Sequence, residues 1–359
     1  MLAARAIQGS NSIEGYHVSV EDAVAAIEGA GPAEVRDEDW DAVLGYRRAL
    51  TYVIQLARDD HFAYSAALIR SLHFMMTEHS LDAGPGLWRP GAIWIRNDHT
   101  GEIVYQAPDH ELVPGLVEEL VEQLQDLPGI AAPVRAAMAH LNLAMIHPFR
   151  DGNGRMARCL QTLVLAREGI LAPELSSIEE YLGANTQAYY DVLAEVGHGA
   201  WHPEREARPW VRFCLTAHFV QATSVLRRMN ESERISLALD ELIVEHRLQT
   251  RCASALFDAA IGLRVRNASY RAALKGWNEE LSHATATTDL AALVKAGLLD
   301  KQGEKRGTYY VAARPLLDIR KAYMRGRQSI DTTHLFDPVS ASSTEPELPF
   351  GTSSGGDGA

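Results

Sequence analysis

The chain has 359 residues, a net charge of −13 and a composition of 47% hydrophobic and 23% charged residues, typical of a globular protein with two or three domains. We expect no membrane-spanning helix, because no apolar run reaches the roughly 18 residues that cross a bilayer, and we find no signal-peptide pattern in residues 1–16. Three scattered cysteines without a CxxC pair argue against a zinc cluster and predict a cytoplasmic protein.

The first part of the chain predicts helices and one hairpin. Residues 92–105 gather β-branched and aromatic side chains around a turn, 97–101, that ends in glycine, which indicates a β-hairpin. A lone hairpin cannot form a core sheet, so we expect it to act as a flap. Helices are predicted at 112–126, which Pro128 and Gly129 end, at 134–146, which is almost entirely apolar and should be buried, and at 155–168 and 209–228.

The character of the chain changes after residue 231. Helices are predicted at about 232–247, 251–261, 267–275 and 284–296, and two short strands follow around a basic loop in 298–313. This order resembles a winged helix-turn-helix domain. The segment 251–327 carries 14 Lys and Arg against 7 Asp and Glu, so a basic module follows an acidic one. From about residue 328 the chain is rich in Ser, Thr, Pro and Gly, which predicts a disordered tail.

The segment 151–155, Asp-Gly-Asn-Gly-Arg, has the features of a phosphate-binding loop. Gly152 and Gly154 allow positive φ angles and close approach to a ligand. The helix that follows directs its free N–H groups and its positive end at the loop. Arg155 and Arg158 share one face at the start of that helix, where cations are unfavourable unless an anion is bound.

Two further side chains extend this site. Asp151 is a hard oxygen ligand that could hold Mg²⁺ beside a polyphosphate. His147 ends the apolar helix just before Pro148, and its unperturbed pKa of about 6.5 suits a general base acting on a hydroxyl. Phe149 is expected to anchor the loop by packing. The residues 147–158 therefore predict an enzyme that handles the phosphates of a nucleotide.

The same twelve residues, HPFRDGNGRMAR, match the Fic family motif H-x-F-x-[DE]-G-N-G-R-x-x-R at every specified position. The preceding helix, the hairpin and the later AYYDVLAE extend the resemblance over about residues 1–220. It implies a mainly α fold, a Fic-type helical bundle with a β-hairpin flap. It also implies transfer of AMP from ATP to a Ser, Thr or Tyr hydroxyl of a protein, with release of pyrophosphate.

The resemblance also implies a role for each matching residue. His147 would deprotonate the target hydroxyl, Asp151 would hold Mg²⁺, and Arg155 and Arg158 would bind the β- and γ-phosphate regions. The loop residues Gly152, Asn153 and Gly154 would cradle the phosphates, with the Asn153 side chain helping.

More distant segments receive roles from the same resemblance. Ile93, Trp94 and Ile95 would form the flap that aligns a target by strand addition, and Tyr189 and Tyr190 would line the nucleoside pocket. Arg96 and Gly197 depart from the family pattern, in which Gly and Asn, respectively, are frequent. These departures bear on flap detail and base preference, and they leave the phosphate chemistry untouched.

Residues 10–15, SNSIEG, fit a second Fic-family pattern, [ST]-x-x-x-E-[GN]. The resemblance implies an inhibitory helix whose Glu14 pairs with Arg158 and blocks the γ-phosphate, so that the wild-type enzyme is nearly silent. Another role that some relatives give this residue is to align a water for the removal of AMP.

These expectations divide the chain into an inhibitory segment, 1–20, a Fic domain with N-terminal helices, 21–230, a winged-helix-like domain, 231–327, and a disordered tail, 328–359. The expected partners are ATP, an unknown target protein, the protein itself as a target, and a homodimer mate. The alternatives are AMP removal, transfer of another group, and a DNA-binding regulator.

The DNA alternative depends on the winged-helix-like segment. Helix 284–296 and the loop offer phosphate contacts through Thr285, Thr287, Thr288, Lys295, Lys301, Lys305 and Arg306. The helix has no Arg, Asn or Gln to read base edges, which favours docking of a target or a subunit over DNA.

Overall fold

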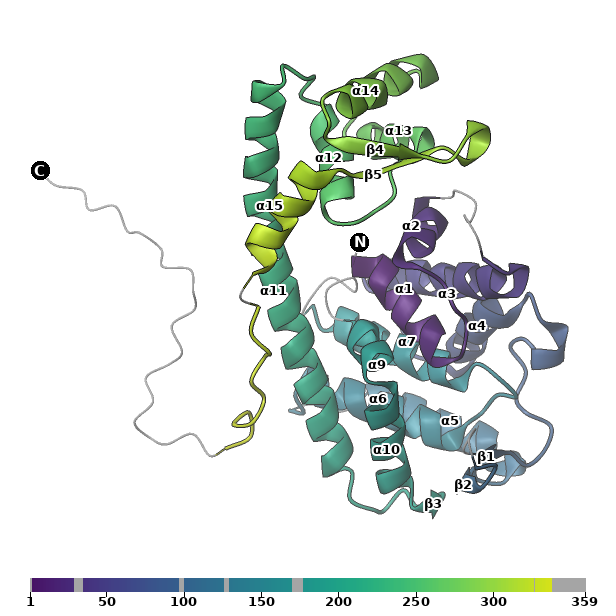
Figure 1. Cartoon of the computed structure of the whole chain (residues 1–359). Helices are drawn as coiled ribbons and strands as arrows, with labels where there is room; N and C mark the ends of the chain where they lie inside the picture. The colour runs from purple at the N-terminus through teal and green to yellow at the C-terminus, as the bar shows by residue number, and fades with distance from the viewer. Residues whose placement is uncertain are drawn as a thin grey trace, which may run out of the picture. The chain divides into compact units, whose positions relative to one another are not determined.

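The computed structural model describes residues 2–28, 35–96, 100–125, 129–169, 177–325 and 327–337. The chain divides into a unit Met1–Gln328, which contains the helices and strands of the described residues, and a unit Ser329–Ala359 (Figure 1). The expected turn residues 97–99, Pro128, the tail beyond 337 and the Arg306 side chain lie outside the described residues. No helix of the described residues is long and apolar enough to cross a membrane.

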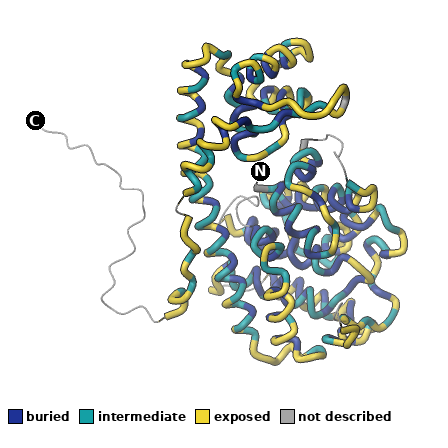
Figure 2. Tube along the Cα trace, in the orientation of Figure 1, coloured by how far each residue is buried: buried dark blue, intermediate teal, exposed yellow. Residues whose placement is uncertain are grey.

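Helices build the N-terminal part around one central helix, which confirms the mainly α fold. The central helix is α7, Asn153–Arg167, which is buried along almost its whole length (Figure 2). It packs closely against α6, Ala132–Ile146, and against α3, Asp37–Leu56. The other helices here are α1 (Leu2–Ile13), α2 (Val20–Glu28), α4 (Ala66–Thr77), α5 (Val113–Gln125), α9 (Glu179–Ala184) and α10 (Thr186–Gly197).

The expected hairpin is present, but it is not alone. Strand β1, Trp94–Arg96, pairs antiparallel with β2, Ile103–Gln106, and a bulge follows Ile95. A third short strand, β3, Gly199–Ala200, pairs parallel with β2 and makes a sheet of order β1-β2-β3. The prediction of an isolated hairpin was therefore wrong, because two residues far along the chain carry no strand pattern of their own. Strand β1 stands at the end of this sheet, so one of its edges has no strand partner among the described residues.

A single helix, α11, replaces the two helices expected at 209–228 and 232–247. It runs for 38 residues, Arg208–Glu245, and crosses the expected domain boundary at 230. Residues 229–231 contain neither Gly nor Pro, so nothing local ends the helix. Its first turns pack through Trp210 and Cys214 with α6 and α10, while Ile235 and Leu239 belong to the core of the C-terminal part.

The C-terminal part has the order of elements that the sequence predicts. Three helices precede a two-stranded sheet: α12 (Cys252–Ala260), α13 (Asn267–Lys275), α14 (His283–Lys295), β4 (Leu299–Gln302) and β5 (Tyr309–Ala312). The helix α15, Arg314–Met324, was not expected, although Pro315 stands where a first helical turn accepts it. The assignment of this part as a winged helix-turn-helix stays a prediction.

Candidate functional site

His147 closes helix α6 in the left-handed conformation, with φ of 50°, and Pro148 follows it. Its Nδ1 lies 3.1 Å from the carbonyl oxygen of Ala144. Because a carbonyl oxygen only accepts, Nδ1 carries the proton and donates it, which leaves the lone pair on Nε2. Burial lowers the pKa of His147, so the ring is held neutral. The ring therefore offers a free base nitrogen at the end of a buried helix.

Arg89 fixes this end of the helix, and sequence reasoning missed it. Its side chain is buried and donates from Nε to the carbonyl of His147 at 2.9 Å, from Nη1 to Gly91 at 2.7 Å, and from Nη2 to Pro108. Gly91 and Pro108 flank the two strands of the hairpin. Arg89 therefore ties the main chain of His147 to both ends of the hairpin. No local pattern distinguishes such an arginine from a surface one.

The loop after Pro148 forms as the glycines predict. Gly152 has φ of 76° and caps α7, which begins at Asn153 and leaves the N–H groups of its first turn free to face an anion. The Asn153 side chain binds the main chain within the loop. Its Oδ1 accepts from the Phe149 N–H and its Nδ2 donates to the Phe149 carbonyl, both at 2.8 Å. This amide therefore holds the loop closed, and the expected role of Asn153 in cradling phosphates stays a prediction.

His73 on α4 is a second supporting residue that the sequence did not indicate. The Gly86 N–H donates to its Nδ1 at 2.9 Å, so Nε2 carries the proton and donates to the Asp151 carbonyl at 2.9 Å. Its ring stacks on Phe149, with the ring centres 3.7 Å apart. Burial lowers the pKa of His73 to about 4, which keeps this arrangement neutral.

Arg155 is a buried cation whose donors are largely unused. Its side chain is 1% exposed, and Nε and Nη1 have no hydrogen-bond partner among the described residues. Nη2 lies 3.5 Å from Oδ2 of Asp151, whose side chain is 54% exposed, and the guanidinium lies 5.0 Å from the Tyr16 ring centre. A buried guanidinium with open donors is costly, which points to an anion as its missing partner.

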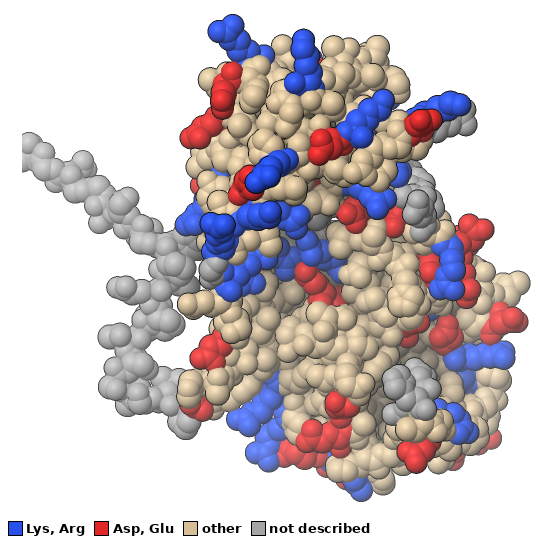
Figure 3. Space-filling model, in the orientation of Figure 1, with Lys and Arg blue, Asp and Glu red and all other residues tan. Residues whose placement is uncertain are grey.

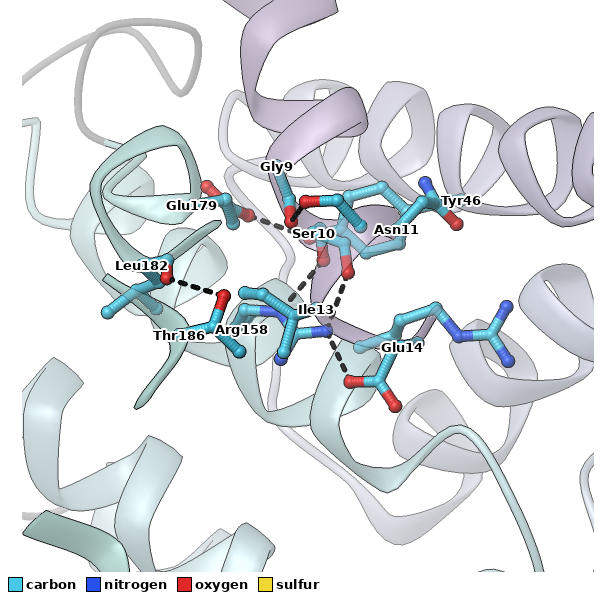
Figure 4. A network of polar contacts seen from close by, with 12 residues as sticks. Gly9, Ser10, Asn11, Ile13, Glu14, Tyr46, Arg158, Glu179, Leu182 and Thr186 are labelled. Carbon is cyan, nitrogen blue, oxygen red and sulfur yellow. Dashed lines mark hydrogen bonds and ion pairs between the residues drawn. The ribbon is translucent and has the colours of Figure 1, made fainter. Parts of the chain in front are cut away.

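Arg158 is also buried, and Glu14 is its ionic partner (Figure 4). Its Nη2 donates to Oε1 of Glu14 at 2.7 Å and to the Ser10 carbonyl at 3.0 Å, and its Nε donates to Ser10 Oγ at 2.8 Å. Burial acts to lower the pKa of Arg158, but Glu14, Tyr189 and Tyr46 together outweigh it and raise the pKa. A Cβ added at Gly154 would collide with Oε1 of Glu14. The Glu14 carboxylate therefore rests against the loop itself.

Helix α1 reaches this position through close packing on α9. A Cβ at Gly9 would collide with the Glu179 carbonyl, and one at Gly183 would lie 2.9 Å from Cα of Gly9. The Glu179 carboxyl is buried and accepts from the Tyr46 hydroxyl at 2.7 Å, and burial raises its pKa. Glycine at both crossing points lets the two helix backbones meet.

The two expected pocket tyrosines lie in different surroundings. Tyr189 is buried, and its hydroxyl lies 3.1 Å from Nε2 of His140. Tyr190 is exposed and donates to the Ile13 carbonyl at 3.1 Å, at the end of α1. Gly197 lies where a Cβ would be 3.2 Å from the Tyr105 ring, so a larger residue would press on the sheet.

The hairpin is anchored on the same helix as His147. The Tyr105 hydroxyl donates to the Met145 carbonyl at 2.8 Å, and Ile95 pairs with Tyr105 across the strands. Trp94 is 47% exposed on the edge strand, and Ile93 precedes it. The structure therefore brings His147, the loop, both arginines and Glu14 together, with the hairpin tied to the same helix end.

Comparisons with known proteins agree with this geometry. Residues 63–165, which include the whole loop, match the Fic/DOC family. The chain is 28% identical over 218 residues to the protein adenylyltransferase Fic of Nematostella vectensis, covering 58% of this chain and 45% of that protein. It is 26% identical over 216 residues to the protein adenylyltransferase fic-1 of Caenorhabditis briggsae, covering 58% and 40%. The chain thus spans less than half the length of these relatives.

The fold also has a counterpart among solved structures. A crystal structure of a Fic family protein from Desulfovibrio desulfuricans G20 superposes with a TM-score of 0.54 at 21% identity, covering 87% of this chain and 86% of that one. This likeness extends the shared fold beyond the residues that match the family.

Proposed function

Because the chain carries a Fic family domain, we propose that it is a protein adenylyltransferase, which transfers AMP from ATP to a Ser, Thr or Tyr hydroxyl of a protein. One observation carries the proposal. Two buried arginines, Arg155 and Arg158, begin the helix behind a glycine loop, and Arg155 keeps buried donors without partners among the described residues. An anion-binding site of this kind suits the β- and γ-phosphates of a nucleoside triphosphate.

The proposed reaction follows from the positions of His147 and of the phosphate site that the loop and the two arginines form. Nε2 of His147 accepts the proton of the target hydroxyl, and the hydroxyl oxygen attacks the α-phosphorus of ATP. The bond from the α-phosphorus to the bridging oxygen breaks, and pyrophosphate leaves with that oxygen. The loop N–H groups and Arg155 stabilise the charge that develops on the phosphates.

Asp151 fits the Mg²⁺ that this reaction implies. Its side chain is 54% exposed, and its Oδ2 lies 3.5 Å from Nη2 of Arg155. One carboxylate together with substrate phosphates and waters is the usual ligand set of Mg²⁺ in nucleotide sites. When bound, the ion supplies neutralisation of phosphate charge and orientation of the polyphosphate.

Glu14 is proposed to inhibit the enzyme. Its carboxylate uses the same guanidinium that the γ-phosphate needs, and it rests against Gly154. Both anions cannot occupy this place together, so ATP binds productively only when the Glu14 carboxylate moves away. The opposite role, alignment of a water for AMP removal, requires the same position, and only activity measurements separate the two.

The flap residues Ile93, Trp94 and Ile95 are proposed to dock the target. Strand β1 has an outer edge with Trp94 exposed on it, and an extended peptide can add to such an edge by main-chain hydrogen bonds. Arg89 would transmit the hairpin position to His147, since it binds the main chain of both.

Mass spectrometry of protein targets tests the proposed function. The Glu14→Gly protein is incubated with each nucleoside triphosphate, alone and with cell lysate, and modified peptides are sequenced. We expect ATP to add one AMP to hydroxyl side chains, on the protein itself and on a target. Addition of phosphate instead, or no addition with any nucleotide, would refute the proposal. Incubating AMP-modified target with the wild type and with Glu14→Gly tests removal: loss of AMP with the wild type alone would assign that role to Glu14.

A further inference from the structure

A second cavity, of about 720 Å³, lies where α11, α12 and α15 meet α1 and α9. None of residues 147–158 lines it, so it is distinct from the loop site. Figure 3 shows Lys and Arg side chains gathered where α11 and α15 cross. Five arginines contribute to the lining: Arg5, Arg227, Arg228, Arg320 and Arg327.

The acidic residues of this cavity do not balance its arginines. Glu180 binds both Arg5, at 3.1 Å, and Arg228, at 2.9 Å, and also accepts from Gln221 at 3.0 Å. Glu231 pairs with Arg327. These two carboxylates are the acids among the lining residues, so three positive charges remain in excess. A cavity with this balance attracts multiply charged anions.

Two of the guanidinium groups have open donors. Nε of Arg227 and Nη1 of Arg228 are buried and have no hydrogen-bond partner among the described residues. Buried N–H groups are normally paired, and an unpaired one costs free energy that a bound acceptor recovers. Phosphate oxygens are suited to this, because a guanidinium binds them with two parallel hydrogen bonds.

Gly262 leaves space for the guanidinium of Arg320, another of these arginines. A Cβ at Gly262 would lie 2.6 Å from Nη1 of Arg320, and Gly262 has φ of 99°. Apolar side chains continue the lining beside the cations, among them Ile235, Phe257 and Ile261. A cavity that joins an apolar wall to clustered arginines, at a volume typical of small-ligand sites, suits a compact phosphorylated molecule.

We propose that this cavity binds a small molecule that carries at least two phosphate groups. Its phosphates accept from Arg227, Arg228 and Arg320, and any ring or apolar group packs on Phe257. The proposal does not depend on AMP transfer, because the cavity shares no residue with the loop site. Arg5 lies on α1, and Glu14 directly follows the end of that helix, so the ligand would lie against the helix that leads into the proposed inhibitory carboxylate.

Calorimetric titration of the full chain with inorganic pyrophosphate and with ADP tests the proposal. We expect binding to the wild type, and a loss of roughly tenfold or more in affinity in Arg227→Ala/Arg320→Ala. The matched control is Arg314→Ala, because Arg314 lies on α15, is 92% exposed and does not line the cavity. Each protein is also titrated with Arg155→Ala added, because the loop site is itself proposed to hold nucleotide phosphates, and the binding that remains then belongs to the cavity.

Two results would overturn the proposal. One is the absence of binding of both probes at millimolar concentration; the other is unchanged binding in Arg227→Ala/Arg320→Ala with circular dichroism and a melting temperature like those of the control. Tighter binding of ADP than of pyrophosphate supports a nucleotide as the ligand. Equal binding supports a ligand recognised by its phosphates alone. AMP transfer is measured separately, so neither result depends on the proposed function.

Discussion

Replacing Glu14 should strengthen ATP binding, and the structure sets the size of the effect. The carboxylate accepts one charge-assisted hydrogen bond from Arg158 at 2.7 Å, and its side chain is 22% exposed. Bonds of this kind contribute about 1.5–3 kcal/mol, and neutral ones about 0.5–1.5 kcal/mol. ATP must displace this contact before its γ-phosphate reaches Arg158, so removing it lowers the cost of binding by the same amount.

Two substitutions divide this effect. Glu14→Gly removes the contact and should lower the dissociation constant of Mg²⁺-ATP by roughly 10- to 100-fold, because about 1.4 kcal/mol corresponds to a factor of ten. Glu14→Gln keeps an acceptor for the Arg158 guanidinium but removes the carboxylate charge, and should lower the dissociation constant by roughly tenfold or less. The assay is calorimetric titration in a His147→Ala background, which prevents turnover during the measurement. The matched control is Glu118→Gln, an exposed glutamate of α5.

The order of the four affinities for Mg²⁺-ATP tests this competition. If Glu14 competes with the γ-phosphate, Glu14→Gly binds most tightly, Glu14→Gln binds next, and the control binds as the parent does. Equal affinities in all four proteins would refute the competition between Glu14 and the γ-phosphate, because no contact would then stand in the way of ATP. A rise in affinity in the control as well would assign the effect to net charge.

Three further predictions concern the residues that hold the base and α1. Burial lowers the pKa of His147, so the neutral base persists as pH falls, and kcat/KM of a Glu14→Gly enzyme should stay on its plateau to below about pH 6.5 before it falls. Arg89→Lys cannot donate to the His147 and Gly91 carbonyls at the same time, so the main chain of His147 is no longer tied to the hairpin. It should lower kcat by roughly tenfold or more while the dissociation constant of ATP stays unchanged. Gly9→Ala places a Cβ on the Glu179 carbonyl; it should cost about 1–3 kcal/mol in unfolding free energy and raise AMP transfer, since α1 cannot dock fully.

Each of these predictions has a result against it. A kcat/KM that falls already from above pH 6.5 would contradict a buried, neutral His147. Arg89→Lys that weakens ATP binding and leaves kcat intact would place Arg89 in nucleotide binding instead of positioning. Gly9→Ala with an unchanged melting temperature and unchanged activity would show that the close contact of α1 with α9 does not matter for inhibition.

Local chemistry explains what the sequence could predict. The glycine loop and the helix after it depend on residues within a few positions of each other, and Gly152 takes the positive φ that its lack of a Cβ allows. The helices and strands of the C-terminal part follow from apolar spacing and turn residues in the same way. The pair of Glu14 and Arg158 is 144 positions apart, and it was reached only through the resemblance of two motifs.

Long-range contacts explain what the sequence could not predict. Arg89 and His73 act through main-chain carbonyls of distant residues, and nothing in their neighbours in sequence marks this. The resemblance gave Asn153 a role in cradling phosphates, but nothing in its local sequence indicated that both ends of its amide bind the main chain of Phe149. The third strand and the unbroken helix α11 were missed because pairing and packing, rather than local composition, decide where such elements begin and end.

The most direct test of AMP transfer uses ATP labelled at a chosen phosphorus. Glu14→Gly protein is incubated with ATP carrying ³²P at the α-position or at the γ-position, and labelled protein is detected after gel separation. We expect that the α-label stays on protein, that the γ-label leaves with pyrophosphate, and that His147→Ala in the same background abolishes labelling. Retention of the γ-label, or α-labelling that survives His147→Ala, would contradict it.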